Sequence, residues 1–372
     1  MKTPETSRFF TPWRNPANGV VSYVLSESVA PVQKHFYYTN RSMSLDGRWL
    51  WVVCMWVPRG GRTAFPVMGV VDFERDEFRV RHDIQPSSQM VDEDTGEIYW
   101  FNGTDLWTCG PQAGAEPRKI NSFPKELAKR RTPQRMATHP NFFAGKKAIN
   151  IDAVFGEEMF LGEMPLDDGP VRVWQKFNKF FDHALTSPTE PDVMMFAHEF
   201  WQEHIEEKFE PWARPYHRMW YIRRGEKARP ILTAPVSHSG HEWWDADGKH
   251  VWYVHYGVGV KKVDVATGRE ENLWPGHLAH ADSSRCGRYV VADAMSDPAV
   301  CDCRVIFKDL QSGKETVLVD SPSLPANATQ CGHLHPHPQF CCGDKYICYT
   351  TTVRGRVDLA IAPTTELVGA TN

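Results

Sequence analysis

A polar residue recurs seven times along this chain, each time just before a short turn that leads into an apolar strand. These residues, which are separated by 49, 50, 44, 58, 39 and 57 positions, are Asn40, Gln89, His139, His183, His241, His280 and His337. A repeat of about 40 to 50 residues with this punctuation is typical of a propeller of four-stranded blades. Because equivalent positions in a propeller converge on one place, the five histidines of this set are predicted to share a single site.

The remaining patterns agree with an all-β chain. Short apolar runs such as Val251–Tyr256 are bounded by Gly, Pro, Asp and Ser, and segments such as Lys262–Gly268 indicate a strand, a tight turn and a second strand. The strand expected at Gly19–Ser26 has no turn motif of its own. We expect it to complete the last blade against Arg356–Ala362 and so to close the ring. The prediction is a single seven-bladed β-propeller domain over residues 1–372.

Few segments have the pattern of a helix, and the charged residues form no block of one sign. Only Pro124–Arg131 and His198–Phe209 are predicted helices, the second as an insertion near residues 198–209 on one face of the propeller. The net charge is −4, with 42 basic and 46 acidic residues mixed throughout, which argues against a nucleic-acid partner. No apolar run reaches the roughly 18 residues of a membrane span, and the N-terminus lacks an apolar signal core. We therefore expect no membrane association and a cytoplasmic protein.

The densest cluster of polar side chains is the segment that begins at Gln330. Histidines occupy the alternate positions His333, His335 and His337, and side chains at alternate positions of an extended segment point to the same side. Together with His280 from the preceding repeat, they offer imidazole nitrogens and one amide oxygen, a set that suits a divalent transition metal such as Mn²⁺. The other interpretation is that these histidines bond backbone groups or line a wet channel.

A second constellation pairs Arg218 with His241. Arg is the natural bidentate partner of a carboxylate, and His is the side chain most easily tuned to exchange a proton near neutral pH. A metal, an Arg and a neutral His together favour removal of a proton next to a carboxylate, since the cations withdraw charge from it. The alternative is a surface ion pair and a hydrogen-bonded interior ring.

A third motif begins at His183, continues through a Ser-Pro-Thr-Glu-Pro-Asp turn and reaches His198 after the next strand. Both histidines are predicted to contact substrate, and His139 joins them because it shares the repeat position. Eight further histidines lie outside the repeat and are predicted to be structural or exposed: His35, His82, His204, His217, His238, His250, His255 and His277.

At these motifs the sequence resembles the oligogalacturonate lyase family, whose members are seven-bladed propellers. The resemblance extends from about Thr138 to the end of the chain. It is clearest in the strings HALTSPTEPDVMMFAHE, RMWYIRRG, SHSGHEWWDADGK, HADSSRCGRY and QCGHLHPHPQF. It implies a divalent metal, usually Mn²⁺, held by three histidines and a glutamine. Those positions match His280, Gln330 and two of His333, His335 and His337; the Gln-x-x-His-x-His spacing favours the first two, whereas the His-Pro-His-Pro string favours the last two.

The resemblance also implies an activity. Its catalytic Arg and His match Arg218 and His241, and its reaction is β-elimination from a uronate-containing oligosaccharide to a 4,5-unsaturated uronate. Ordinary pKa values favour His241 as the base and Arg218 as a charge clamp, while the resemblance equally allows Arg218 as the base. The alternatives are a lyase or glycosidase acting on a rhamnosyl-glucuronate cap, and a propeller that binds sugar without catalysis.

Overall fold

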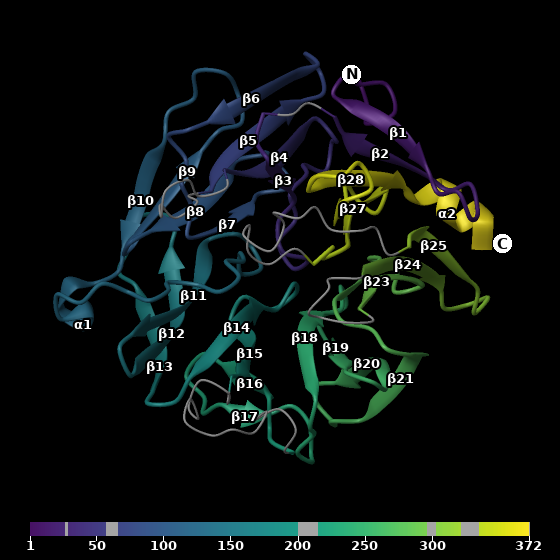
Figure 1. Cartoon of the computed structure of the whole chain (residues 1–372). Coiled ribbons are helices and arrows are strands. Elements are labelled where there is room, and N and C mark those ends of the chain that lie inside the picture. Colours follow the sequence, from purple (N-terminus) through teal and green to yellow (C-terminus); the bar gives the residue numbers. More distant parts are fainter. Residues whose placement is uncertain (27–28, 57–65, 200–214, 296–302, 321–334, 372) are drawn as a thin grey trace.

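Seven antiparallel sheets stand around a common axis as the blades of a propeller (Figure 1). The computed structural model describes residues 1–372 except 27–28, 57–65, 200–214, 296–302, 321–334 and 372. The first strand of each four-stranded blade lies nearest the axis and the last lies at the rim. The predicted seven-bladed all-β architecture is confirmed.

The chain runs around the ring blade by blade. The first three blades are β3 (Val32–Lys34), β4 (Trp49–Met55), β5 (Val67–Asp72) and β6 (Glu77–Arg81); β7 (Ser88–Val91), β8 (Ile98–Asn102), β9 (Asp105–Cys109) and β10 (Arg118–Ser122); and β11 (Ala148–Phe155), β12 (Glu158–Pro165) and β13 (Arg172–Phe177). The next three are β14 (Phe181–Thr186), β15 (Val193–His198), β16 (Met219–Arg223) and β17 (Arg229–Pro230); β18 (Ser239–Trp244), β19 (His250–His255), β20 (Gly259–Asp264) and β21 (Glu270–Pro275); and β22 (Ala281–Ser283), β23 (Tyr289–Met295), β24 (Cys303–Asp309) and β25 (Glu315–Val319).

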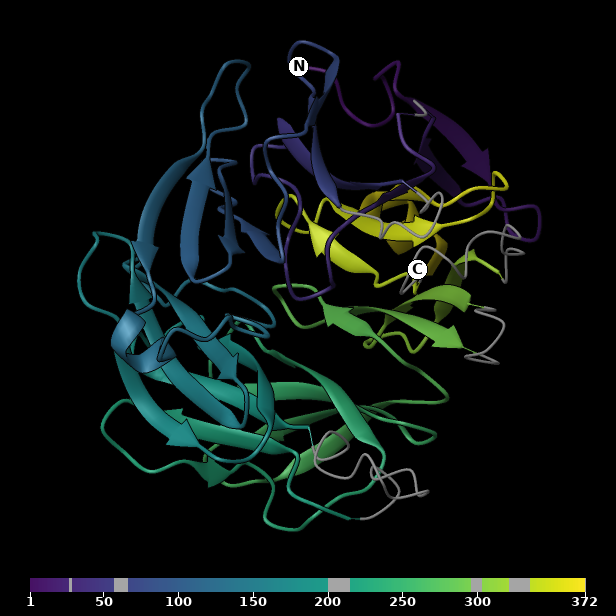
Figure 2. The ribbon, with the colours of Figure 1, turned by 60° about the vertical axis from the view of Figure 1, so that its left-hand side comes forward.

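The seventh blade joins both ends of the chain. It contains β26 (Gln339–Cys341), β27 (Tyr346–Thr351) and β28 (Asp358–Pro363), followed by β2 (Val21–Leu25) and, outermost, β1 (Phe10–Arg14). Strand β2 pairs with β28 through Tyr23 with Ile361 and Val24 with Ala360. Figure 2 shows these N-terminal strands beside the C-terminal ones. The predicted ring closure is confirmed, and β1 adds a rim strand that the sequence did not indicate.

Both faces of a blade pack against neighbouring blades, which explains why the inner strands are continuous apolar runs. Six of the seven residues of β4 are buried, and so are all six of β5. The indole of Trp51 in β4 donates a hydrogen bond to the carbonyl of Gly96 in the next blade, at 2.8 Å. Clusters of buried apolar side chains therefore lie between neighbouring blades.

The third blade departs from the four-stranded pattern. In place of an innermost strand, the described residues form isolated bridges from Phe142 to Ile149 and from Arg135 to Val154. The repeat residue His139 therefore lies on an irregular segment between these two bridges. In the sequence, His139 was singled out only by its position in the repeat, without a supporting motif beside it.

In the part of the chain that the structure describes, two short helices lie at the rim. Helix α1 (Lys125–Ala128) falls within the predicted Pro124–Arg131, whereas α2 (Thr364–Thr371), which follows β28, was not predicted. Its threonines have low helix propensity, and its stability comes from packing on the sixth and seventh blades. The insertion predicted near 198–209 lies almost wholly outside the described residues. Among those that are described, no helix has the length and apolar character needed to cross a membrane.

Candidate functional site

The ring of Tyr37, in the segment between β3 and β4, marks the point where the repeat positions converge. Four repeat histidines surround it, with ring centroids 4.3, 4.7, 5.9 and 6.4 Å away: His139, which is stacked on it, His337, His280 and His183. The fifth, His241, has its ring centroid 3.9 Å from that of His280. The repeat therefore brings five histidines to one place, as its spacing predicts. Nothing in the pattern singled out Tyr37.

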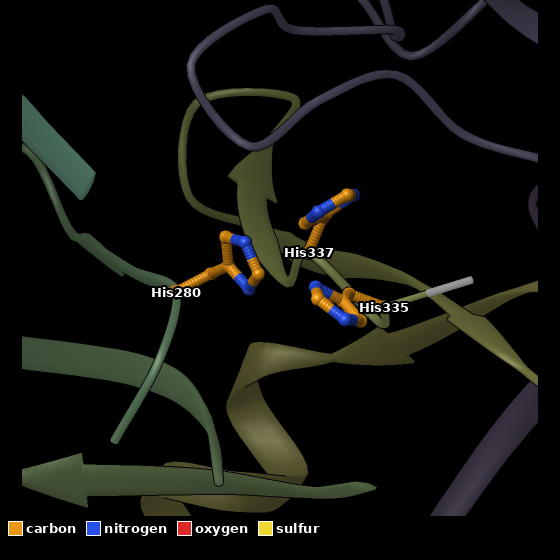
Figure 3. Close-up of side chains that lie close together, drawn as sticks. All are labelled: His280, His335 and His337. Carbon is orange, nitrogen blue, oxygen red and sulfur yellow. The ribbon is translucent and has the colours of Figure 1, made fainter. Parts of the chain in front are cut away.

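Three of the histidines form a cluster that could hold a metal ion. His280 precedes β22, while His335 and His337 precede β26, and in Figure 3 the His280 ring points toward the other two. One nitrogen from each lies within 4.8 Å of the others. This cluster contains both histidines of the His-Pro-His-Pro alternative, His335 and His337. Gln330 and His333 lie outside the described residues.

A buried carboxylate supports this cluster from behind. Asp293 in β23 accepts hydrogen bonds from the backbone N–H of His280 (2.7 Å), from Nδ1 of the same ring (3.0 Å) and from the N–H of His337 (3.2 Å). Because Nδ1 of His280 donates to the carboxylate, its Nε2 is the nitrogen that can coordinate a metal. Three imidazoles with a carboxylate behind them fit a divalent first-row transition metal.

His35 holds the backbone of one member of the cluster. Its Nε2 lies 2.5 Å from the carbonyl oxygen of His337, and its Nδ1 lies 3.1 Å from the hydroxyl of Thr350. His337 has a φ of 45°, in the left-handed region that costs a non-glycine residue energy. Burial lowers the pKa of His35 to about 4, so the ring is neutral and can donate through Nε2. The prediction that this histidine is structural is correct.

Arg218, just before β16, is held between two carboxylates. Its Nη1 lies 2.6 Å from Glu199, directly after β15, and its Nε donates to Glu242 in β18. All three side chains are buried. Burial by itself lowers the pKa of Arg218, but the two carboxylates outweigh it, so the pKa lies well above its ordinary value. Arg218 is therefore a permanent cation, which makes it a poor base.

His241 is oriented by its Nδ1 nitrogen. That atom lies 2.6 Å from the carbonyl oxygen of Ala279 and 2.9 Å from the hydroxyl of Tyr256. A carbonyl only accepts, so Nδ1 carries the hydrogen and Nε2 keeps its lone pair. Burial, with His280 close by, lowers the pKa of His241 well below its usual range. The ring is neutral at physiological pH and can accept a proton at Nε2.

Arg218 and His241 line one cavity of 550 Å³. Of the residues predicted to act there, its wall includes His139, His183, Arg218 and His241. The wall also includes Tyr37, Tyr216, Tyr256 and Glu199, for which no role was predicted, and His238, which was predicted to be structural or exposed. The two glutamates that hold Arg218 each follow a histidine singled out by the motifs. That adjacency was the one available signal for them.

His198 does not occupy the position expected for it. It ends β15 with its ring centroid 4.8 Å from that of Phe181, and the next residue, Glu199, lines the cavity instead. Because side chains alternate along a strand, a shift of one residue exchanges the buried and cavity-facing positions. The remaining two repeat positions, Asn40 and Gln89, carry amides, and the Asn40 amide donates to the carbonyl of Pro140 at 2.7 Å.

A seven-bladed propeller with a histidine-lined cavity at its axis can be compared with known proteins. No family model matches the sequence. An oligogalacturonate lyase of Dickeya dadantii (strain 3937) is 25% identical over 55% of this chain, and the match spans only about half of that enzyme's length, 55%.

Solved structures agree over the whole ring. An oligogalacturonate lyase in complex with manganese superposes with a TM-score of 0.75, at 16% identity and 98% coverage of both chains. An oligogalacturonate lyase from Vibrio parahaemolyticus gives 0.75 at 15% identity, covering 95% of this chain and 96% of that one. At such identities the structures establish the shared fold. Sequence and fold are thus both consistent with the resemblance to oligogalacturonate lyases.

Proposed function

We propose that this protein is a metal-assisted lyase of the oligogalacturonate lyase family, which cleaves a short uronate-containing oligosaccharide by β-elimination. The observation that carries the proposal is the contact between two constellations. The His241 ring lies 3.9 Å from His280 of the three-histidine cluster, and Arg218 lines the same cavity as His241. Groups suited to polarise a carboxylate and to remove the adjacent proton thus meet at one place.

The cluster of His280, His335 and His337 would hold the divalent metal, Mn²⁺ by analogy with the manganese complex of the similar lyase. When bound, such an ion supplies a Lewis acid that withdraws charge from the C6 carboxylate of the uronate. Asp293 orients the His280 ring, and His35 orients the backbone of His337, so both act as positioning residues.

His241 is the proposed base. Its Nε2 takes the proton from C5 of the uronate, the electron pair of that C–H bond forms the C4=C5 double bond, and the C4–O4 bond breaks. The departing sugar oxygen then takes up a proton, and the product is a 4,5-unsaturated uronate. The neutral state of His241, with Nδ1 held by Ala279, suits this step because the ring is ready to accept at Nε2.

Arg218 is the proposed charge clamp. Glu199 and Glu242 fix the guanidinium at the cavity wall and keep it charged, so it can attract the uronate carboxylate without giving up a proton. His183 and His139, which share the wall, are proposed substrate contacts. His198 lies behind the wall and would support Glu199 rather than touch sugar.

The ultraviolet absorbance of the conjugated product tests the reaction directly. Oligogalacturonate and a rhamnosyl-glucuronate saccharide are each incubated with the protein and Mn²⁺. An absorbance rise with one of them, abolished by a chelator and restored by Mn²⁺, is the expected result. New reducing ends without absorbance would indicate hydrolysis, and the absence of any product with both would refute the lyase proposal.

A matched pair of variants tests the role of His241. His241→Asn should lower kcat by at least about 100-fold, the scale of a lost general base, while the thermal midpoint stays within a few degrees. Asn tolerates the left-handed φ of 53° found at this position. His255→Asn, at a half-buried histidine on the neighbouring strand β19, should retain activity. Equal losses in both variants would count against a specific role for His241.

A further inference from the structure

A second group of potential metal ligands shares no residue with the three-histidine cluster. Oxygens of Asp182 and Glu199 and a nitrogen of His183 lie within 4.8 Å of one another. Pairing of β14 with β15 sets Asp182 opposite Ala197, and the N–H of Glu199 donates to the carbonyl of Phe180, which brings the three side chains together. The Tyr37 ring lies near both groups, with its centroid 6.4 Å from that of His183 and 5.9 Å from that of His280.

The Asp182 carboxylate has one oxygen that nothing in the described structure satisfies. Its Oδ2 accepts from Arg135 at 3.4 Å, but its Oδ1 is buried without a hydrogen-bond partner among those residues. The side chain is 6% exposed, and Oδ1 lies 4.0 Å from Nε2 of His183. Two ligands bound to one ion at about 2.1 Å are roughly 3 to 4 Å apart, so this separation suits a shared cation.

The charges of the side chains around Asp182 also favour a bound cation. Four buried carboxylates surround this region: Asp152, Asp182, Glu199 and Glu242. Two guanidinium groups face them, since Arg135 contacts the first two and Arg218 the last two. Among these six described side chains, four negative and two positive charges leave a surplus of two negative charges. Buried charge without compensation is costly, and a single divalent cation would remove this surplus.

We propose that Asp182, His183 and Glu199 form a second divalent-cation site, distinct from the three-histidine cluster. Two carboxylate oxygens and one imidazole nitrogen form a mixed ligand set that suits Mn²⁺ or a similar first-row ion. The cation neutralises the surplus charge and fixes the carboxylate of Glu199. It thereby fixes the position of Arg218, whose Nη1 lies 2.6 Å from that carboxylate. Its role is positional, and it does not depend on which reaction the cavity performs.

The competing occupant is a proton. Burial, together with the neighbouring Glu199, raises the pKa of Asp182 well above its ordinary value, so protonation would also reduce the surplus. The two occupants differ in a way that can be measured. A proton leaves no metal behind, and Asp182→Asn would then imitate the protonated carboxyl and leave the stability unchanged or raised.

Metal content distinguishes them. The full-length protein is stripped with chelator, equilibrated with Mn²⁺ alone, desalted and analysed by inductively coupled plasma mass spectrometry. The proposal expects two ions per chain in the wild type, and the loss of one of the two in Asp182→Asn. The matched variant His335→Gln should lose the other ion, and the double variant both. Glu199→Gln serves as a second test should Asp182→Asn fail to fold.

Thermal unfolding supplies a second readout. Chelator should lower the midpoint of the wild type more than that of Asp182→Asn, because the variant has no ion left to lose at this site. A wild type that binds one ion, or an Asp182→Asn variant that still binds two, would overturn the proposal. Neither readout requires activity, so its failure is separate from failure of the lyase proposal.

Discussion

Substitution of Asp293 perturbs the three-histidine cluster without removing any of its three imidazoles. The Asp293 carboxylate is fully buried and accepts the Nδ1 hydrogen of His280 as well as the backbone N–H groups of His280 and His337. Asp293→Asn keeps the shape but turns one acceptor oxygen into a donor NH₂. One of the three N–H groups must then face another donor, and the His280 ring loses the carboxylate that sets its orientation.

The expected magnitude follows from these contacts. Loss of a carboxylate behind a metal-ligating histidine typically weakens metal binding about 10- to 100-fold. A buried donor left without its charged acceptor costs about 1 to 3 kcal/mol of folding stability. We therefore expect Asp293→Asn to bind Mn²⁺ at least about 10-fold more weakly, in a chelator-competition titration, and to unfold at a lower temperature than the wild type.

Asp309→Asn is the matched control. Asp309 is also fully buried in the sixth blade and accepts hydrogen bonds from Arg288 at 2.9 and 2.6 Å, but it is the last residue of β24, at the outer hairpin of the blade. It should lose stability and retain the wild-type affinity for Mn²⁺. Equal affinity in wild type and Asp293→Asn, with only stability reduced, would refute the idea that this carboxylate orients a metal ligand.

Two further predictions concern stability. The pKa of His35 is about 4 in the folded chain and about 6.5 when unfolded, so the unfolded state takes the proton first as the pH falls. Stability should therefore decline between roughly pH 6.5 and 4, by about 2 kcal/mol from pH 7 to pH 5 for this group, and urea unfolding of His35→Gln should show a shallower decline. In β2, the strand that closes the ring, Val24→Ala should lower the free energy of unfolding by about 2 kcal/mol because Val24 is fully buried. Val21→Ala, at a half-buried position of the same strand, should lower it by less than about 1 kcal/mol. Equal losses in the two variants would contradict the role assigned to the buried face of β2.

The fold could be predicted because each repeat specifies one blade and the blades obey the same geometry. The repeat marks where a strand starts, and the axis then brings positions such as His183 and His280 together. Glycines support it physically: Gly248 has a φ of +66°, and a Cβ there would lie 1.9 Å from the Thr189 hydroxyl oxygen. Local turn chemistry therefore determined a long-range arrangement.

The site could be predicted only in part, for two physical reasons. Tyr37 lies in the segment between β3 and β4, and the path of that segment depends on tertiary packing. The sequence therefore did not mark Tyr37 as the side chain among the histidines. The face to which a strand's last residue points depends on register, and Glu199 rather than His198 reached the cavity for that reason. The spacing of His335 and His337 was ambiguous in the sequence because both candidate pairs have the same i, i+2 separation.

Closure of the ring by the N-terminal strands has a consequence for folding. The hydrogen bond from His35 to the carbonyl of His337 spans 302 residues, and β2 pairs with β28 across almost the entire chain. Contacts of such long range form late, because their loop-closure entropy must be overcome first. The three-histidine cluster lies beside this last seam, so the metal-binding capacity should emerge only when the ring closes. Recovery of Mn²⁺ affinity during refolding would then report the final step of assembly.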